Sequence, residues 1–473
     1  MTLFRRWYRE AESAGVPQPD AIALATSGPA GPSARMVLFE PLINAMTHIS
    51  AAGRAEAEAS AKRWCDGEAR GQLDGVPVTI KDNLAVAGMP ATFGSPAFRS
   101  FVPIDDELPV ARVRQAGAVV LGKTNLPEFA LEGYTANALF GTTGNPWSPA
   151  LTPGGSTGGG AASVAAGYAP VALGTDGGGS LRRPAAHCGL VGLKTSIGRC
   201  PRRGGLPQLL LDFEVAGAMT RTMRDARTLY DIMEGPAAAA ASSLTLPDPP
   251  SPQGPLRILA VERFGEAPLD PHIGRSFRVF VDRLAGLGHA VHNGQVPLSV
   301  ESLAEVWPDI GCVHLSRLFA RQPEIGASAS PKYRAMAEQG ARLSAARMLD
   351  ILDRVTAIRS EAATLFRSRD IVVAPSIAAL AWPKAESHPV EIDGQPVGPR
   401  GHSVFTGWVN AATVPALALP SDPAPDGRLI GVQLVAAFGA DRLLLDLGET
   451  LAPHGDACAA ASPPWLSPQP RMG

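Results

Sequence analysis

Two glycine-rich segments that each carry a serine constrain the fold of this chain more than any other feature. GGSTGGG spans 154–160 and contains Ser156, and GTDGGGS spans 174–180 and ends at Ser180, 24 residues later. Because glycine has no Cβ, such segments can pass very close to neighbouring backbone. A single segment of this kind is typical of a turn. Two of them, flanking the small-residue helical stretch 161–168 and downstream of IKDN with Lys81, predict a functional site.

Strand and helix patterns alternate along the chain, which is typical of an α/β sheet. Apolar runs predict strands at Gly75–Asn83, Ala118–Leu121, Val171–Leu173, Leu256–Val261, Ile371–Pro375 and Gly431–Ala436. Helical periodicity predicts helices at 42–70, 109–116, 161–168, 221–234, 271–285, 331–369 with one break, and 440–451. The stretch 236–255, rich in Ala, Ser and Pro, predicts a surface loop between two halves.

Composition limits the classes to which the chain can belong. Its 473 residues suit either several domains or one large α/β domain, and 45% apolar residues exclude a mostly disordered chain. A formal net charge of −2 gives no basic excess for nucleic acid. The five cysteines, an odd number with no CxxC pair, fit reduced thiols better than disulfides or a zinc site. We find no signal peptide and no apolar run of ~18 residues, so we expect a cytoplasmic protein without membrane contact.

Two short motifs suggest other enzyme classes, and both are disfavoured on physical grounds. GAVVLGKT (117–124) matches the P-loop pattern, but the four residues between its glycines predict a strand instead of a phosphate-binding loop. GGSTG (154–158) matches the nucleophile elbow of α/β-hydrolases, which needs a strand directly before it. The preceding WSPALTP contains two prolines and cannot be a central strand. His402 or His454 would have to complete that site, and neither lies in a telling context.

Beyond these motifs, the chain resembles the amidase signature family of serine hydrolases. The matching stretches occur in the family's order and are GVPVTIKDN, VLGKTNLPEFA, TGNPWSPALTPGGSTGGGAASVAAG, ALGTDGGGSLRRPAAHCGLVGLKTSIGR and FTGWVNAATVPALALP…GVQLV. They cover roughly residues 42–455, and the part over 75–200 is highly specific. The resemblance implies an α/β fold with a single large domain, in which a mixed central β-sheet is sandwiched by helices. We expect this domain at 42–460, with its signature region at 75–205, an atypical segment at 1–41 and a loose tail at 461–473.

The resemblance implies three catalytic residues, namely Lys81, Ser156 as the serine after a cis peptide, and Ser180 as the nucleophile. The chemistry is consistent, because a serine hydroxyl is a weak nucleophile that needs a base. A lysine can be that base only when it is neutral, and burial favours the neutral form. Ser156 would relay the proton between Ser180 and Lys81. Backbone N–H groups of the loop would form the oxyanion hole, and we expect them from Gly177, Gly178, Gly179 and Ser180.

Several neighbouring positions carry expectations of structure instead of chemistry. Thr157 stands where the family often has a second serine, and its hydroxyl could alter the hydrogen bonds of the relay. Asp82 and Asn83 are expected to fix the loop of Lys81. Asp176 and Arg182 are expected to pin the nucleophile loop as a polar pair.

Arg183 is the candidate for substrate binding. It lies three residues after Ser180, at a position that tends to face the acyl side of the pocket in the family. In that place it would favour a substrate with an anionic or strongly polar group. In the alternative, Arg183 points to solvent or pairs with an acid such as Glu128 or Asp212.

The N-terminal segment Phe4–Glu40 resembles the opening of pyridoxamine-phosphate oxidase-like flavoproteins. The rest of that flavin-binding barrel is missing, so we expect no FMN. No cofactor and no metal are expected anywhere in the chain.

The sequence therefore predicts an enzyme, an amidase that cleaves a linear carboxamide C–N bond through an acyl-Ser180 intermediate. One alternative is the glutamine-hydrolysing A-type subunit of a tRNA-dependent amidotransferase. That subunit usually has an acidic residue just before the FT of its C-terminal motif, where HSVFT places Ser403. Urea or ester cleavage is a further alternative. As partners we expect a small-molecule amide, no nucleic acid and no membrane, and a homodimer is left open.

Overall fold

A mixed sheet of eleven strands forms the centre of the molecule in a computed structural model. The structure describes residues 40–451 except 239, 241–242, 244–246, 251 and 253. The strand order is β1-β3-β2-β6-β8-β7-β14-β15-β11-β9-β10. Neighbours β3-β2-β6 are parallel, as are β11-β9-β10, and the strands between them pair antiparallel. The strands are β1 Met46–Ile49, β2 Pro77–Lys81, β3 Val119–Thr124, β6 Val171–Asp176, β7 Val191–Lys194, β8 Val215–Thr220, β9 Arg257–Ala260, β10 Ala290–Asn293, β11 Ile371–Pro375, β14 Ala416–Ser421 and β15 Ile430–Ala436.

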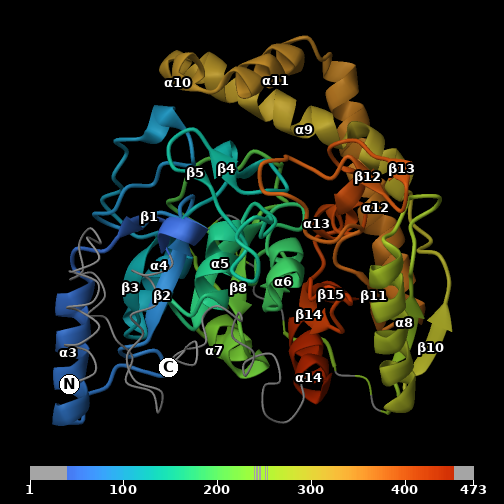
Figure 1. The fold of residues 1–473 in the computed structure, drawn as a ribbon, viewed down its shortest axis with the longest axis horizontal. Coiled ribbons are helices and arrows are strands. Elements are labelled where there is room, and N and C mark those ends of the chain that lie inside the picture. The colour runs from blue at the N-terminus through green and yellow to red at the C-terminus, as the bar shows by residue number, and fades with distance from the viewer. Residues whose placement is uncertain are drawn as a thin grey trace, which may run out of the picture.

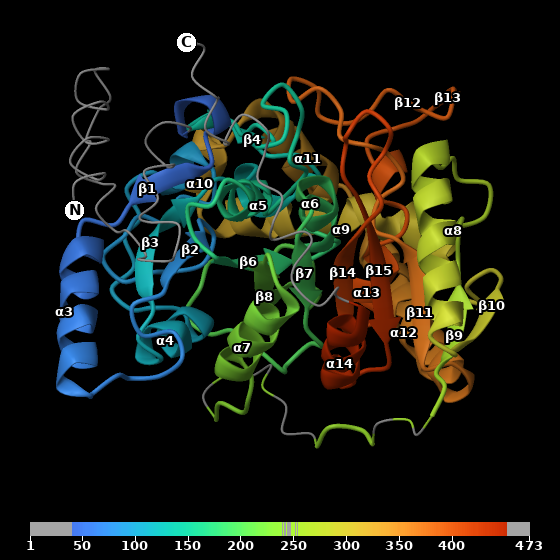
Figure 2. The same ribbon diagram turned by 60° about the horizontal axis from the view of Figure 1, so that its bottom comes forward.

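Helices cover both faces of this sheet, as Figures 1 and 2 show. Successive side chains of β8 point to opposite faces of the sheet and so belong to different helix layers. Ala218 packs in the cluster that contains residues of α4, α7, α8 and α14, whereas Met219 packs with α5 and α6. The expected α/β fold, a mixed sheet sandwiched by helices, is confirmed. The helices are α3 Gly53–Asp66, α4 Leu108–Gln115, α5 Gly158–Ala165, α6 Arg182–Cys188, α7 Met223–Met233, α8 Pro271–Gly286, α13 Gly407–Ala411 and α14 Asp441–Leu451.

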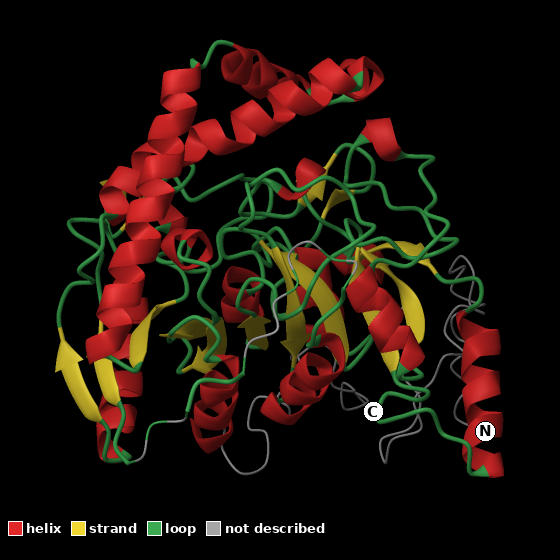
Figure 3. Ribbon diagram, turned by 180° about the vertical axis from the view of Figure 1, so that it is seen from behind, coloured by secondary structure: helices red, strands yellow, loops and turns green. Residues whose placement is uncertain are grey.

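A helical excursion leaves the sheet after β10. It contains α9 Val300–Arg321, α10 Pro323–Ser328 and α11 Pro331–Ala341, and α12 Ala345–Ser368 leads back to β11. In Figure 3, which views the molecule from behind, α9–α11 lie above the strands. A buried side chain of α9, Trp307, reaches back to the loops at this edge of the sheet.

Most of the predicted elements are present near their expected bounds. The strand at Ile371–Pro375 is found as β11, and the helical pattern over 331–369 is broken once, between α11 and α12. One expectation is wrong: the stretch 42–70 is not helical throughout, because Met46–Ile49 forms β1 and pairs antiparallel with β3.

Some predictions fall on residues that the structure does not describe. These are the flavoprotein-like segment, of which only Glu40 is described, the tail 461–473, and His454. Among the described residues, no helix combines the length and the apolar character needed to cross a lipid bilayer.

Candidate active site

The ends of two neighbouring parallel strands bring the predicted residues together. Lys81 is the last residue of β2, and Thr175 and Asp176 end β6, which pairs parallel with β2. Because parallel strands end at the same sheet edge, their terminal side chains meet there. Ser180 follows in the loop from β6 to α6, and Ser156 lies just before α5. Residues separated by 99 positions in the sequence thus share one site.

Lys81, Ser156 and Ser180 form a continuous chain of hydrogen bonds. Lys81 Nζ lies 2.8 Å from Ser156 Oγ, and Ser156 Oγ lies 2.9 Å from Ser180 Oγ. The Gly155–Ser156 peptide is cis. Distances near 2.8 Å are those of good hydrogen bonds, so a proton can pass from Ser180 to Lys81 through one hydroxyl.

The surroundings of Lys81 favour its neutral form. The side chain is fully buried, and besides Ser156 its Nζ contacts Thr175 Oγ1 at 2.9 Å. Burial lowers the pKa of Lys81 from its usual 10.5 to about 7, against the opposing charges of Glu214 and Asp176. A large fraction of Lys81 is therefore unprotonated near neutral pH.

The loop before Ser180 is shaped by its glycines and held by one carboxylate. Gly179 has a φ of +113°, and a Cβ there would collide with the side chain of Thr406. The Gly179 N–H donates to Asp176 Oδ1 at 2.7 Å. This corrects one expectation, because an N–H already bound to a carboxylate is not free for an oxyanion. The expected donors that remain are Gly177, Gly178 and Ser180.

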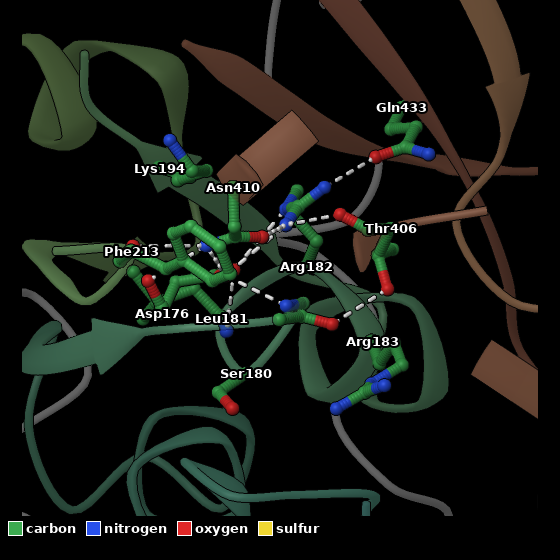
Figure 4. A network of polar contacts seen from close by, with 12 residues as sticks. Asp176, Ser180, Leu181, Arg182, Arg183, Lys194, Phe213, Thr406, Asn410 and Gln433 are labelled. Carbon is green, nitrogen blue, oxygen red and sulfur yellow. Dashed lines mark hydrogen bonds and ion pairs between the residues drawn. The ribbon is translucent and has the colours of Figure 1, made fainter. Parts of the chain in front are cut away.

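Asp176 and Arg182 pin this loop, as expected. Two nitrogens of Arg182 each donate to a carboxylate oxygen of Asp176 at 3.1 Å, and both side chains are fully buried (Figure 4). Asn410 donates to the carboxylate at 2.9 Å, and Gln433 accepts from Arg182 at 2.8 Å. Burial alone would raise the pKa of Asp176, but the adjacent Arg182 charge holds it well below its usual range.

The other predicted supports also have structural partners. Asp82 accepts from the Thr92 backbone N–H at 2.9 Å, and Asn83 donates to Thr175 Oγ1 at 3.1 Å. The Thr157 hydroxyl donates to the Thr175 carbonyl at 3.0 Å, which directs it to backbone and not to the serine pair.

Both disfavoured motifs are explained by the fold. Lys123 of the P-loop-like motif lies inside β3, fully buried, and donates to the carbonyls of Asp82 and Pro90 at 3.1 Å. Ser156 of the elbow-like motif contacts Lys81 and Ser180 instead of a histidine.

Arg183 lies beside the serines and not with either expected acid. It is 5% exposed, and its Nη2 donates to the Gly155 carbonyl at 3.4 Å. Asp212 pairs with Arg359 at 2.6 Å, and Glu128 accepts from Ser95 and Ser330. The alternatives of solvent exposure or pairing with these two acids are therefore wrong.

Sequence reasoning missed several neighbours of the site. Trp307 of α9 would lie 2.9 Å from a Cβ on Gly178, and Arg400 stacks on its ring at 4.7 Å from guanidinium carbon to ring centroid. They come from segments more than 100 residues after the signature region, where no local pattern marks them.

Comparison with known proteins decides the family. A family model described as Amidase matches residues 33–445. The chain belongs to the amidase family. Its resemblance to this family is thereby confirmed, and the chain is a hydrolase of the amidase signature type. The match begins inside the segment 1–41 that the sequence set apart.

Solved structures and a curated relative agree with this assignment. A structure described as an amidase is 30% identical with a TM-score of 0.79, and the match covers 95% of this amidase-family chain and 98% of that one. The 6-aminohexanoate cyclic dimer hydrolase is 27% identical with a TM-score of 0.80, over 92% and 94% of the two chains. The A-type subunit of the glutamyl-tRNA(Gln) amidotransferase from Nitratidesulfovibrio vulgaris (strain DP4) is 32% identical, over 92% of this chain and 93% of its own length.

The curated relative corrects the expectation about partners. We expected a small-molecule amide as the partner and excluded nucleic acid. The relative is by name one subunit of an amidotransferase, and that amidotransferase is named for a tRNA. Excluding nucleic acid is therefore wrong for a chain this similar to such a subunit.

Proposed function

We propose that this chain cleaves the C–N bond of a carboxamide through an acyl-enzyme on Ser180. The observation that supports this most is the hydrogen-bonded row of Lys81, Ser156 and Ser180, which ends in a fully buried amine. A buried lysine with a lowered pKa next to a serine pair is the arrangement that a hydroxyl nucleophile requires.

The reaction begins when neutral Lys81 draws a proton from Ser156, which takes the proton of Ser180. The Ser180 Oγ attacks the amide carbonyl, and the negative oxygen forms beside the backbone N–H groups of Gly177, Gly178 and Ser180. One such donor typically contributes about 3 kcal/mol to the transition state. The proton returns through Ser156 to the leaving nitrogen, so ammonia or an amine departs. Water then attacks the acyl-Ser180 ester by the same relay and releases the acid.

Arg183 is proposed to contact the substrate. Its guanidinium is buried close to the serine pair, bound weakly to the Gly155 carbonyl. A buried guanidinium without a carboxylate partner is costly, and a polar or anionic substrate group would relieve that cost.

A second candidate function is the glutamine-hydrolysing subunit of an amidotransferase. The curated relative favours it, because a subunit of that name matches over 92% of this chain. At residue level, Ser403 stands where that subunit type usually has an acid, and its hydroxyl donates to the Arg400 carbonyl at 2.9 Å. Both candidates share the same chemistry at Ser180 and differ in substrate and partners.

The two candidates are separated by measuring ammonia and acid release from the purified chain. The substrates are glutamine and a panel of simple primary amides. Turnover of simple amides by the chain alone supports the first candidate, and turnover confined to glutamine supports the second. Ser180→Ala is expected to be inactive, whereas Ser360→Ala on the exposed face of α12 is expected to match wild type. An active Ser180→Ala would overturn both.

A further inference from the structure

Trp307 is a buried aromatic side chain that reaches the loop before Ser180 from far along the sequence. It lies in α9, the first helix of the excursion, is 5% exposed, and has no part in the reaction described above. A Cβ on Gly178 would lie 2.9 Å from Cζ2 of the indole, and a Cβ on Gly407 would lie 3.2 Å from Cζ3. The edge of the six-membered ring therefore packs directly against both glycines and leaves no room for a side chain on Gly178.

The indole is itself held in place by two other side chains. Phe213 stacks on it with the ring centroids 5.5 Å apart and the planes inclined by 30°, and the guanidinium carbon of Arg400 lies 4.7 Å from the ring centroid. Phe213 is tied to the nucleophile loop, because its carbonyl accepts from Asn410 Nδ2 at 3.3 Å and the same amide donates to Asp176 at 2.9 Å. Stacking and the cation–π contact fix the plane of the ring, so Gly178 packs against a rigid wall.

The two peptide groups on either side of Gly178 are held differently. In the Gly178–Gly179 peptide, the carbonyl accepts from Thr406 Oγ1 at 2.8 Å and the N–H donates to Asp176 Oδ1 at 2.7 Å. The Gly177–Gly178 peptide carries the Gly178 N–H, and no described residue accepts a hydrogen bond from that N–H. Because glycine permits a wide range of backbone angles, hydrogen bonds alone do not fix the direction of this N–H. Packing of the indole edge against Gly178 supplies the missing restraint.

We propose that Trp307 is a positioning residue of the reaction, which keeps the Gly178 N–H aimed at the oxyanion that forms on the substrate. This deepens the proposed function and rests on it. Donors of an oxyanion hole are effective because they are already oriented when the negative charge develops. Without the indole, the Gly177–Gly178 peptide adopts further orientations in which the donor is misdirected. Since the oxyanion exists only in the transition state and the tetrahedral intermediate, the loss falls on kcat and hardly on substrate binding.

The test separates a loss of transition-state stabilisation from a general loss of structure. The substrate is the primary amide that the wild type cleaves fastest, and the probe is the boronic acid with the same chain, such as propylboronic acid for butanamide. A boronic acid forms a tetrahedral adduct with a serine hydroxyl and so mimics the intermediate. Removing an oxyanion donor typically costs ~10²–10³-fold in kcat, so we expect Trp307→Ala, which misdirects one, to lower kcat by about ten- to hundredfold. KM is expected to stay within about threefold, and the Ki of the boronic acid to rise by about the factor by which kcat falls.

Phe280→Ala is the matched control, because Phe280 of α8 is also 5% exposed and packs in the helix layer of α4, α7 and α14. It is expected to lower the melting temperature and to leave kcat and the Ki of the boronic acid at wild-type values.

For Trp307→Ala, unchanged kcat and Ki, a rise in KM alone, or an equal loss in Phe280→Ala would overturn the positioning role. Trp307→Phe keeps a ring that can stack on Phe213, and it is expected to show smaller losses in kcat and Ki than Trp307→Ala. If Trp307→Ala does not fold, Trp307→Phe decides: lowered kcat with raised Ki supports the role, and wild-type values of both contradict it. A wild type that neither cleaves amides nor is labelled at Ser180 by a fluorophosphonate contradicts the proposed function instead.

Discussion

Removing the amine of Lys81 tests the proposed proton relay in the most informative way. Lys81 Nζ is 2.8 Å from Ser156 Oγ, so Lys81→Ala leaves the serine pair without a base. Loss of a general base typically costs ~10²–10⁴-fold in rate. We expect kcat/KM of Lys81→Ala to fall by a factor in this range while the fold, monitored by circular dichroism, is retained.

The structure predicts the direction in which kcat/KM changes with pH. Burial lowers the pKa of Lys81 to about 7, and the neutral amine is the active form. About one tenth of Lys81 is neutral at pH 6 and about nine tenths at pH 8. The wild-type kcat/KM is therefore expected to rise roughly tenfold from pH 6 to a plateau above pH 8. The residual activity of Lys81→Ala is expected to lack this limb.

Lys194 provides a matched control for this experiment. It is also fully buried with a pKa lowered to about 7, but its Nζ donates to the carbonyls of Thr195 and Val414 and not to a serine. Lys194→Met is expected to keep the acid limb in kcat/KM. The relay is refuted if Lys81→Ala retains activity within tenfold of wild type, or if it keeps the wild-type pH profile.

Three further predictions follow from the same structure. Arg182→Ala leaves the Asp176 carboxylate buried without its cation, and we expect chemical denaturation to show a loss of about 3–5 kcal/mol; a change under 1 kcal/mol would contradict the network. Gly178→Ala places a Cβ 2.9 Å from Trp307, so we expect a large loss of kcat with only a small change in the melting temperature. An unchanged kcat would count against an oxyanion role of the Gly178 N–H. The full-length chain is expected to be colourless, and flavin absorbance at one equivalent per chain would show that segment 4–40 binds FMN after all.

The local features of the site could be predicted from the sequence because they are encoded locally. Glycine has no substitute in the loop before Ser180, where a Cβ on Gly178 or Gly179 would meet Trp307 or Thr406. The same holds beside Ser156, where a Cβ on Gly155 would collide with the backbone of Tyr134, so both glycine patterns are visible in a single chain. Short apolar runs in the sequence correctly indicated β2, β6 and β11, because each of these strands is buried along its whole length.

The remaining parts of the site depend on long-range packing. Arg400 and Trp307 come together only because α9 folds back over the sheet edge, and nothing in either segment signals this. The use of the Gly179 N–H by Asp176 is likewise a property of the folded loop, since all consecutive glycines look equivalent in the sequence. The net charge of the chain led us to exclude nucleic acid as a partner, and that exclusion was wrong. Only the similarity to an amidotransferase subunit revealed the error.

The claim of an acyl-enzyme on Ser180 is tested most directly by mass spectrometry of the chain quenched during turnover of an amide. We predict the mass of the acyl group on the peptide that contains Ser180, its absence in Ser180→Ala, and no acyl group on Ser156. An acyl group on Ser156, or turnover by Ser180→Ala, would contradict the account.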